Sequence, residues 1–546
     1  MDCGRRGIRP RGAPDRRYRP IDCRDARASL NEIGISRAGF AVTDHALASP
    51  REVGAIDSCW RRLIPSWPLV VAVAALARLL AQPQALLNDP DTYLHVAAGR
   101  WMISHIALPV HDPFSYTMAG ASWVPHEWLA EIVLAAIYNI AGWSGLVLLT
   151  AACFALTMAI LARFLLRRAE PFSVLIMTIL AAALAQGHVL VRPHILTFPL
   201  LVLWSGELFA TREEGSRPPF SLLPLMIVWA NLHGGFMFGV ALAGFVLIEA
   251  VLFPASGRSR FDEAKRWGLF VLLTAGAGLM TPNGVAGFLQ PFRLLAMPAL
   301  KSSFVEWQSP DFQHFPALEA CLLGLIALGF TTGARLQPMR LLLVLGLSHM
   351  ALQSVRNAEL LGFVAPLAVA PHLGPKIADL IRELPTSSFS RYAARLCAPA
   401  SRAAVALAVL VMAGASLPLL LHPIERKDGR QTPAKALAAA RRMGLLSGRV
   451  FNSEAFGGYL IFEGVPSFID GRIEMYGNSF LARYMKAQSG DAATLGALLD
   501  RYHVTWALLA PTQGAAMRIE SLDGWRRVYG DADAVIDVRT DARRFR

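Results

Sequence analysis

Residues 143–163 read WSGLVLLTAACFALTMAILAR, and the arginine at the end is their only charged side chain. A helix of about 20 such residues is long enough to cross the roughly 30 Å hydrocarbon core of a bilayer. The composition of the 546-residue chain agrees, since 54% of its residues are hydrophobic, 17% are charged and the mean hydropathy is +0.41. Soluble domains carry about 25% charged residues. The stretch therefore predicts a transmembrane helix, and the composition predicts an integral membrane protein.

Apolar stretches of similar kind recur on both sides of this one. The segment 127–141 is also apolar, but it is short and holds Glu127 and Glu131, so it suits either a twelfth span or an interfacial helix. We expect it to lie in the membrane interface, because only that placement gives the charge asymmetry of the loops described below. The sequence thus predicts a polytopic α-helical membrane protein with about eleven transmembrane helices, at 64–82, 143–163, 172–190, 195–210, 220–232, 236–253, 268–281, 317–332, 341–354, 358–372 and 403–421.

The loops between these spans differ in positive charge. One side holds sixteen basic residues, in the loops that follow the spans ending near 163, 210, 253, 332 and 372, whereas the other side holds five. Cytoplasmic loops of membrane proteins carry an excess of lysine and arginine. We therefore expect the N-terminus to be cytoplasmic and residues 84–142 to lie outside.

Both ends of the chain differ from the hydrophobic middle. Residues 1–62 hold thirteen arginines and predict a disordered, basic cytoplasmic tail. Residues 63–421 form the predicted transmembrane domain, whose outer loop 84–142 carries juxtamembrane helices. Residues 422–546 predict a soluble α/β domain on the outer side, because short β-type runs alternate with helical patterns. Strands are expected at Arg449–Asn452, Ser467–Asp470, Trp506–Leu509, Trp525–Tyr529 and Ala534–Val538, and helices at Pro433–Met443, Asn478–Lys486 and Ala492–Tyr502.

Ionisable residues gather at the predicted outer ends of the spans. Such groups are costly near membrane depth and usually face a cavity or a pathway. Their concentration on one side predicts a water-filled outer cavity. They include Asp89, Asp91, His95, Arg100, His111, Asp112, His126, Glu127, Glu131, His188, Arg192, His194, His233, Glu306, Asp311 and Arg356, and the asparagines Asn231, Asn283 and Asn357 lie in the same regions.

The first outer loop is the richest of these segments and reads LNDPDTYLHVAAGRW over residues 87–101. Asp89 precedes Pro90, a residue that suits the first turn of a helix, so Asp89 is either a helix cap or part of a site. Asp91 and His95 are four residues apart and share a helix face. A carboxylate in this position serves as a general base or as a metal ligand.

The order Asp91, His95, Arg100 resembles the first outer loop of the GT-C glycosyltransferase superfamily, which includes protein O-mannosyltransferases and lipid A aminoarabinose transferases. Thr92 stands where that family has a second acid. A set of uncharacterised bacterial GT-C-like proteins is similar over residues 64–540. The matching segments are NDPDT at 88–92, HEWLAE at 126–131, NLHGG at 231–235, GGYL at 457–460 and FIDGR at 468–472.

This resemblance implies a GT-C-like glycosyltransferase of the bacterial inner membrane, with a periplasmic C-terminal domain. It would transfer a sugar from a polyprenyl-phosphate donor to a glycan, lipid or protein acceptor. The implied catalytic residues are Asp91, Asp89 and His95, and the implied acceptor-side residues of the C-terminal domain are Asp470 and Arg472. The implied donor-phosphate or substrate-binding residues are Arg100, His126, Glu127, Arg192, His194, His233, Glu306 and Arg356.

Several interpretations stay open at this point. Arg192 and Arg356 equally suit interfacial arginines that reach lipid headgroups, and Asp470-Gly471-Arg472 equally suits a structural turn. A transporter or lipid flippase, or a non-catalytic GT-C relative in envelope assembly, is the alternative function. The metal requirement is unknown and a divalent metal is left open. No nucleotide or organic cofactor is expected, because neither a GxGxxG nor a P-loop motif is present. No nucleic-acid partner is expected, because the sequence has no DNA-binding motif and the cytoplasmic arginines of a membrane protein account for its positive charge.

Overall fold

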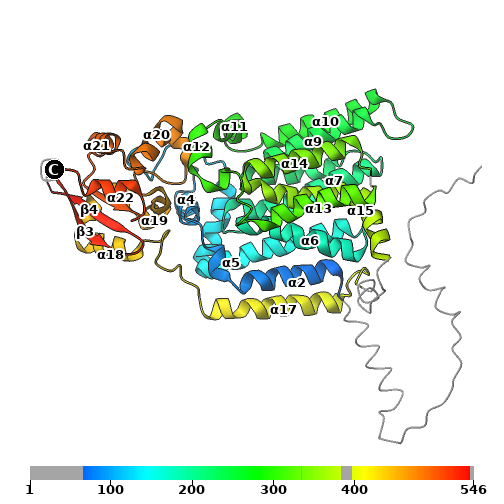
Figure 1. Cartoon of the computed structure of the whole chain (residues 1–546), viewed down its shortest axis with the longest axis horizontal. Helices are drawn as coiled ribbons and strands as arrows, with labels where there is room; N and C mark the ends of the chain where they lie inside the picture. Colours follow the sequence, from blue (N-terminus) through cyan, green and yellow to red (C-terminus); the bar gives the residue numbers. More distant parts are fainter. Residues whose placement is uncertain (1–64, 334, 383–395, 541–546) are drawn as a thin grey trace, which may run out of the picture. The chain divides into compact units, whose positions relative to one another are not determined.

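The computed structural model describes residues 65–333, 335–382 and 396–540, so the predicted tail 1–62 lies outside the described residues. Each of the eleven apolar stretches overlaps a helix, and Figure 1 shows those of these helices that it labels packed alongside one another. The helices of these stretches are α2 (Trp67–Leu80), α5 (Trp128–Leu165), α6 (Pro171–Ala185), α7 (Phe198–Glu213), α8 (Leu223–Leu232), α9 (Phe236–Leu252), α10 (Arg260–Gly278), α13 (Pro316–Thr332), α14 (Pro338–Gln353), α15 (Ala358–Arg382) and α17 (Arg402–Leu421).

Five helical segments of the described chain are long and apolar enough to cross a membrane: 128–165, 171–188, 193–213, 355–379 and 402–421. Four shorter apolar helices lie at 67–80, 220–232, 236–252 and 316–332. Helices α10 and α14 belong to neither group. The number of spans therefore stays a prediction, although the helices themselves are where the sequence places them.

Helix α5 contains the boundary between the expected interfacial segment and the following span. Ala141 and Gly142 leave the helical conformation, and Gly142 has a φ of 56°. Glycine occupies this left-handed region without the penalty that a Cβ atom causes. The chain therefore bends where the sequence predicts a change from an interfacial helix to a transmembrane helix.

Short helices lie between the long ones. Those near the predicted outer side are α3 (Pro83–Leu86), α4 (Asp91–His105), α11 (Gly284–Leu295) and α12 (Pro298–Ser303). The 3-10 turns are η2 (Gln186–His188), η3 (Pro193–Thr197), η4 (Phe220–Leu222), η5 (Val305–Trp307), η6 (Val355–Asn357) and η7 (Leu445–Ser447).

The C-terminal segment folds around a four-stranded sheet of order β1-β2-β4-β3, in which β1 and β2 are parallel and the other pairs are antiparallel. Four of the five expected strands and all three expected helices are confirmed. The strands are β1 (Val450–Asn452), β2 (Trp506–Leu509), β3 (Trp525–Gly530) and β4 (Val535–Arg539). The helices are α18 (Ala434–Arg442), α19 (Glu454–Phe462), α20 (Ile473–Gln488), α21 (Ala492–Arg501) and α22 (Gly514–Ile519).

The expectation of a strand at Ser467–Asp470 is wrong. This segment forms only an isolated bridge between Ser467 and Ser115 of the first outer loop. The Phe468 amide donates to the Asn452 side chain at 2.8 Å, so side chains rather than a neighbouring strand satisfy part of its backbone. Helices α19 and α22 were not expected from the sequence.

The C-terminal segment packs directly on the first outer loop, and Figure 1 shows α19 beside α4. The Tyr93 ring of α4 meets the rings of Trp143, Tyr459 and Phe462 at centroid distances of 5.0, 5.0 and 5.2 Å. A Cβ atom on Gly458 of α19 would lie 2.7 Å from the Pro90 carbonyl oxygen, so only glycine permits this approach. Residues of the first outer loop and of the C-terminal segment therefore pack against each other at one end of the helices.

Candidate active site

The N-terminal end of α4 lies against the chain that leads into η3. The Thr92 hydroxyl donates to the Val191 carbonyl at 2.9 Å, and the Val191 amide donates to the Leu86 carbonyl at 2.9 Å. Thr92 is fully buried. Thr92 thus docks the start of α4 onto Val191, and the residue after Val191, Arg192, therefore lies at this end of the helix.

Arg192 contacts three carboxylates. Its Nη2 lies 2.9 Å from Oδ2 of Asp91, and its Nη1 lies 3.3 Å from Oδ2 of Asp89 and 3.1 Å from Oε2 of Glu306. The other carboxylate oxygen of Glu306 lies 3.5 Å from Nη1 of Arg356. We call these five residues, Asp89, Asp91, Arg192, Glu306 and Arg356, the outer cluster.

Asp89 has both of the roles that the sequence leaves open. Its Oδ1 accepts a hydrogen bond of 2.8 Å from the Asp91 amide at the start of α4, while its Oδ2 faces Arg192. The carboxylate therefore closes the first turn of the helix and belongs to the cluster. Its capping role predicts that asparagine could replace it structurally.

The two other carboxylates of the outer cluster differ in their affinity for protons. Burial raises the pKa of Asp91 to about 6, with Arg192 acting against this shift and Asp89 adding to it. Burial also acts to raise the pKa of Glu306, but Arg192 and Arg356 outweigh it and lower that pKa to about 2. Asp91 is therefore suited to exchange a proton near neutral pH, whereas Glu306 remains an anion.

A second group of polar side chains surrounds Glu127. Its Oε1 lies 3.4 Å from Nε2 of His233 and 3.9 Å from Nε2 of His126, and its Oε2 lies 3.9 Å from Nδ1 of His95. Burial acts to raise the pKa of Glu127, but the three imidazoles lower it to about 2. His95 also contacts Oε1 of Glu131 at 3.2 Å. The structure thus brings His95, His126, Glu127 and His233 together beside the outer cluster.

Two asparagines hold the loop that carries His126 and Glu127. The Asn283 side chain donates to the Pro125 carbonyl at 3.0 Å, and the Trp128 indole donates to the Asn231 side chain at 2.9 Å. Asn231 in turn donates to the Met280 carbonyl at 3.0 Å. The loop is therefore fixed by α8 and by the turn before α11.

Two of the predicted substrate-binding residues have other partners. His194 contacts the His188 carbonyl through Nε2 at 2.6 Å, and its ring lies 6.0 Å from that of His233, at the edge of the site. Arg100 donates to the Asn139 side chain at 3.0 Å and packs on the rings of Tyr138 and Phe462. No contact joins Arg100 to the outer cluster among the described residues.

Asp470 and Arg472 form buried ion pairs that join the C-terminal segment to the first outer loop. Arg472 donates to Asp470 through Nε at 2.7 Å and through Nη2 at 2.8 Å, and to Oδ1 of Asp112 through Nη1 at 2.7 Å. Tyr476 donates a further hydrogen bond of 2.6 Å to Asp470. These contacts support the interpretation of Asp470-Gly471-Arg472 as a structural turn.

That turn nevertheless reaches the site. A Cβ atom on Gly471 would lie 2.1 Å from Oδ1 of Asp91, so the backbone of the turn lies in close contact with this carboxylate. Glu454 and Glu474 also come from the C-terminal segment, and burial raises the pKa of each; Asp91 adds to the shift of Glu454. Sequence reasoning missed these three residues, and the only signal for Gly471 is its place inside the FIDGR segment.

A mostly apolar cavity of about 590 Å³ lies between α2, α5 and α6. Its walls include Leu79, Phe154 and Ile179, and its lining also contains Asn88 and Leu190. Asn88 directly precedes Asp89, and Leu190 lies two residues before Arg192. The cavity therefore extends along α2 and reaches residues that neighbour Asp89 and Arg192 in the sequence, although no residue of the outer cluster lines it.

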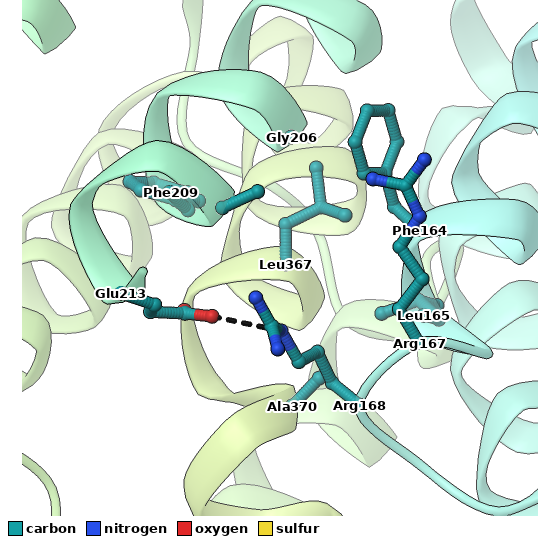
Figure 2. A pocket seen from close by; sticks show the side chains of 10 residues that line it. Phe164, Leu165, Arg167, Arg168, Gly206, Phe209, Glu213, Leu367 and Ala370 are labelled. Carbon is teal, nitrogen blue, oxygen red and sulfur yellow. Dashed lines mark ion pairs between the residues drawn. The ribbon is translucent and has the colours of Figure 1, made fainter. Parts of the chain in front are cut away.

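A second pocket lies among α5, α7 and α15 and is drawn in Figure 2. Arg168 and Glu213 form an ion pair of 2.9 Å on its wall. Its volume of about 20 Å³ suits little more than a single water molecule. This pocket is too small for a sugar or for an isoprenoid chain.

Among the described residues, no group of three or more histidine, cysteine, aspartate or glutamate side chains has an arrangement that could hold a metal ion. The metal requirement thus remains as open as the sequence leaves it.

No family model and no curated protein matches the sequence. Solved structures with some likeness include the Archaeoglobus fulgidus oligosaccharyltransferase AglB in complex with an inhibitory peptide and a dolichol-phosphate, at 12% identity over 81% of this chain and 69% of that chain, with a TM-score of 0.47. ArnT from Cupriavidus metallidurans bound to undecaprenyl phosphate is 15% identical over 90% of this chain and 98% of that chain, with a TM-score of 0.43. Its apo state gives 15% identity, 89% and 99% coverage and a TM-score of 0.46. These values are too low to carry an argument about function, which therefore depends on the geometry of the chain's own residues.

Proposed function

We propose that the chain is a membrane glycosyltransferase that moves a sugar from a polyprenyl-phosphate donor to a hydroxyl-bearing acceptor on the outer side of the membrane. The donor phosphate would bind at Arg192 and Arg356, and Asp91 would act as the general base. The acceptor would be a glycan, a lipid or a protein of the cell envelope.

The observation that carries this proposal is the position of the apolar cavity. Its volume of about 590 Å³ is within the roughly 300–1,000 Å³ typical of ligand sites, and its lining includes Asn88 and Leu190, which stand one residue before Asp89 and two residues before Arg192. An isoprenoid chain in the cavity would place its phosphate beside guanidinium groups, which bind phosphate through paired hydrogen bonds. An apolar chain that ends in an anion fits this combination of surfaces.

The reaction would be a single displacement at the anomeric carbon. The acceptor oxygen forms a bond to that carbon while the bond to the phosphate oxygen breaks and its electron pair goes to the phosphate. Asp91 takes the proton of the acceptor hydroxyl, and the pKa of about 6 supports this role at neutral pH. Arg192 and Arg356 would stabilise the departing phosphate electrostatically, and the anomeric configuration would be inverted.

The acceptor would approach from the side of the C-terminal segment. Gly471 lies against Oδ1 of Asp91, whereas Oδ2 of Asp91 faces Arg192. The two oxygens of this carboxylate thus point toward different parts of the molecule, and the donor and the acceptor would meet between them. Glu454 and Glu474 would line the acceptor side.

The test is turnover of a panel of polyprenyl-phosphate sugars by the purified full-length chain in detergent. Release of polyprenyl phosphate from at least one donor, dependent on Asp91, is the expected result. The same protein in liposomes serves to test the alternative: lipid translocation without any cleaved donor would show a flippase and would contradict the proposal.

A further inference from the structure

The carboxylate of Glu306 occupies an unusual place in the outer cluster. Its two oxygens face two different guanidinium groups, with Oε2 at 3.1 Å from Nη1 of Arg192 and Oε1 at 3.5 Å from Nη1 of Arg356. A phosphate group that binds both arginines would need the same position between them. Its charged oxygens would then compete directly with Glu306.

The short segment that carries Glu306 is fixed to the chain after α14. The Ser354 hydroxyl donates to the Glu306 carbonyl at 2.8 Å, and the Val355 amide donates to the Gln308 carbonyl at 3.0 Å. The guanidinium of Arg356 stacks on the Trp307 ring at 4.3 Å. The preceding helix α12 is tied to the C-terminal segment, because the Ala299 amide donates to the Asn478 side chain at 3.0 Å. We call residues 298–308 the strap.

The charges of the outer cluster explain why a phosphate and Glu306 would exclude each other. Two guanidinium groups face three carboxylates, so the cluster already has one more negative than positive charge when all are ionised. Addition of an anionic phosphate would increase this excess, whereas exchange of Glu306 for a phosphodiester would leave it unchanged. Repulsion between like charges at such short distances strongly disfavours a phosphate bound while Glu306 stays in place.

We propose that Glu306 occupies the position of the donor phosphate when the site is empty. Its carboxylate then holds Arg192 and Arg356 in place, and it leaves this position when a polyprenyl phosphate binds. This inference rests on the proposed function, since it concerns the regulation of the same site. The side chain is 29% exposed, so it can leave the cluster without unpacking a core. Its return after transfer would help to displace the polyprenyl phosphate product.

The test is the affinity of the purified full-length chain for undecaprenyl phosphate, measured by titration in native mass spectrometry. Glu306→Gln should bind this lipid about tenfold more tightly than the wild type, because the competing anion is gone and each 1.4 kcal/mol corresponds to about tenfold. Ser354→Ala, which removes one hydrogen bond of the strap, should change the affinity in the same direction by a smaller factor.

Asp311→Asn is the matched control. Asp311 follows the strap and is exposed, and its carboxylate contacts His314 at 2.8 Å rather than either arginine, so the affinity should not change. An affinity of Glu306→Gln that is equal to or lower than that of the wild type would overturn the inference, as would a lack of binding by this variant. Lipid binding that responds as expected without turnover of any sugar donor would refute the proposed function alone.

Discussion

Two charged clusters lie at opposite ends of the same helices. The outer cluster precedes α7 and follows α14, whereas the inner cluster, which we define as Arg212, Glu249 and Arg340, lies at the end of α7 and α9 and at the start of α14. In the inner cluster, Nε of Arg340 lies 3.0 Å from Oε2 of Glu249, and Nε of Arg212 lies 3.6 Å from Oε1 of Glu249.

The clusters differ in their access to ligands. The side chains of Glu249 and Arg340 are each 2% exposed, and the Arg340 guanidinium is covered by the Phe209 ring at 4.1 Å. In the outer cluster, Arg192 is 22% exposed, and the apolar cavity reaches Leu190, two residues before it in the chain. Buried ion pairs often fix one arrangement of elements, whereas exposed charges beside a cavity remain available to bind. The inner cluster thus fits a structural lock, and the outer cluster fits a reaction site.

The largest expected effect is that of Asp91→Asn. An amide keeps the size of the side chain but cannot accept the proton of the acceptor, so transfer should fall by about 10²–10⁴-fold. Thermal stability should change little. The comparison is Asp89→Asn at equal expression, which should be milder because asparagine also caps helices. If the Asp89→Asn variant is inactive while the Asp91→Asn variant is active, Asp89 rather than Asp91 is the general base.

The second prediction concerns the inner cluster. Glu249→Gln removes the carboxylate opposite Arg340 and leaves a buried charge unpaired, so it should destabilise the protein by about 3–5 kcal/mol. The rate of transfer per folded molecule should stay the same. The melting temperature of the purified protein checks this, with Glu207→Gln as control, because its pair with Arg167 is 4.0 Å long and exposed. Loss of turnover without loss of stability would contradict the assignment of a structural role.

The third prediction concerns lipid binding. Arg192→Lys and Arg356→Lys should each weaken the binding of undecaprenyl phosphate by about tenfold, since an ammonium group cannot reproduce the two parallel hydrogen bonds of a guanidinium. Arg100→Lys is the matched control, because Arg100 contacts Asn139 and not the outer cluster. If all three variants bind undecaprenyl phosphate with equal affinity, the phosphate does not bind at Arg192 and Arg356.

The smallest expected effect is a shift in pH dependence. Asp91 must be ionised to act as a base, so turnover should decrease as the pH falls through about 6, the raised pKa of this group. The negative charge of Asp89 contributes to the raised pKa of Asp91. The Asp89→Asn variant should therefore have the acid limb of its pH profile at lower pH. A limb that stays in place in this variant, or moves to higher pH, would show that another group controls it.

The sequence was sufficient to predict the helices and several of the polar residues that the structure brings together, because apolar length and charge position depend on local composition. It did not reveal which arginine meets which acid. Arg192 and Asp91 are separated by 101 residues, and their contact depends on the docking of Val191 against Leu86 and Thr92. Arg100, by contrast, shares a helix with Asp91 and still has other partners.

The turn at Gly471 shows the same limit from the C-terminal side. Its approach to Asp91 depends on the long-range pairing of Arg472 with Asp112, which no local pattern encodes. Asp470 and Arg472 looked equally like site residues and like a structural turn in the sequence. Only their buried hydrogen bonds indicate that they position a neighbour.

The most direct test of the account follows the anomeric carbon itself. The purified full-length chain is incubated with a polyprenyl-phosphate sugar of known anomeric configuration and an acceptor, and the product is examined by NMR, with Asp91→Asn as the blank. Single displacement at the outer cluster predicts a product of inverted configuration together with free polyprenyl phosphate, and at least about a hundredfold less product from Asp91→Asn. Retained configuration, or equal product from the wild type and Asp91→Asn, would contradict it.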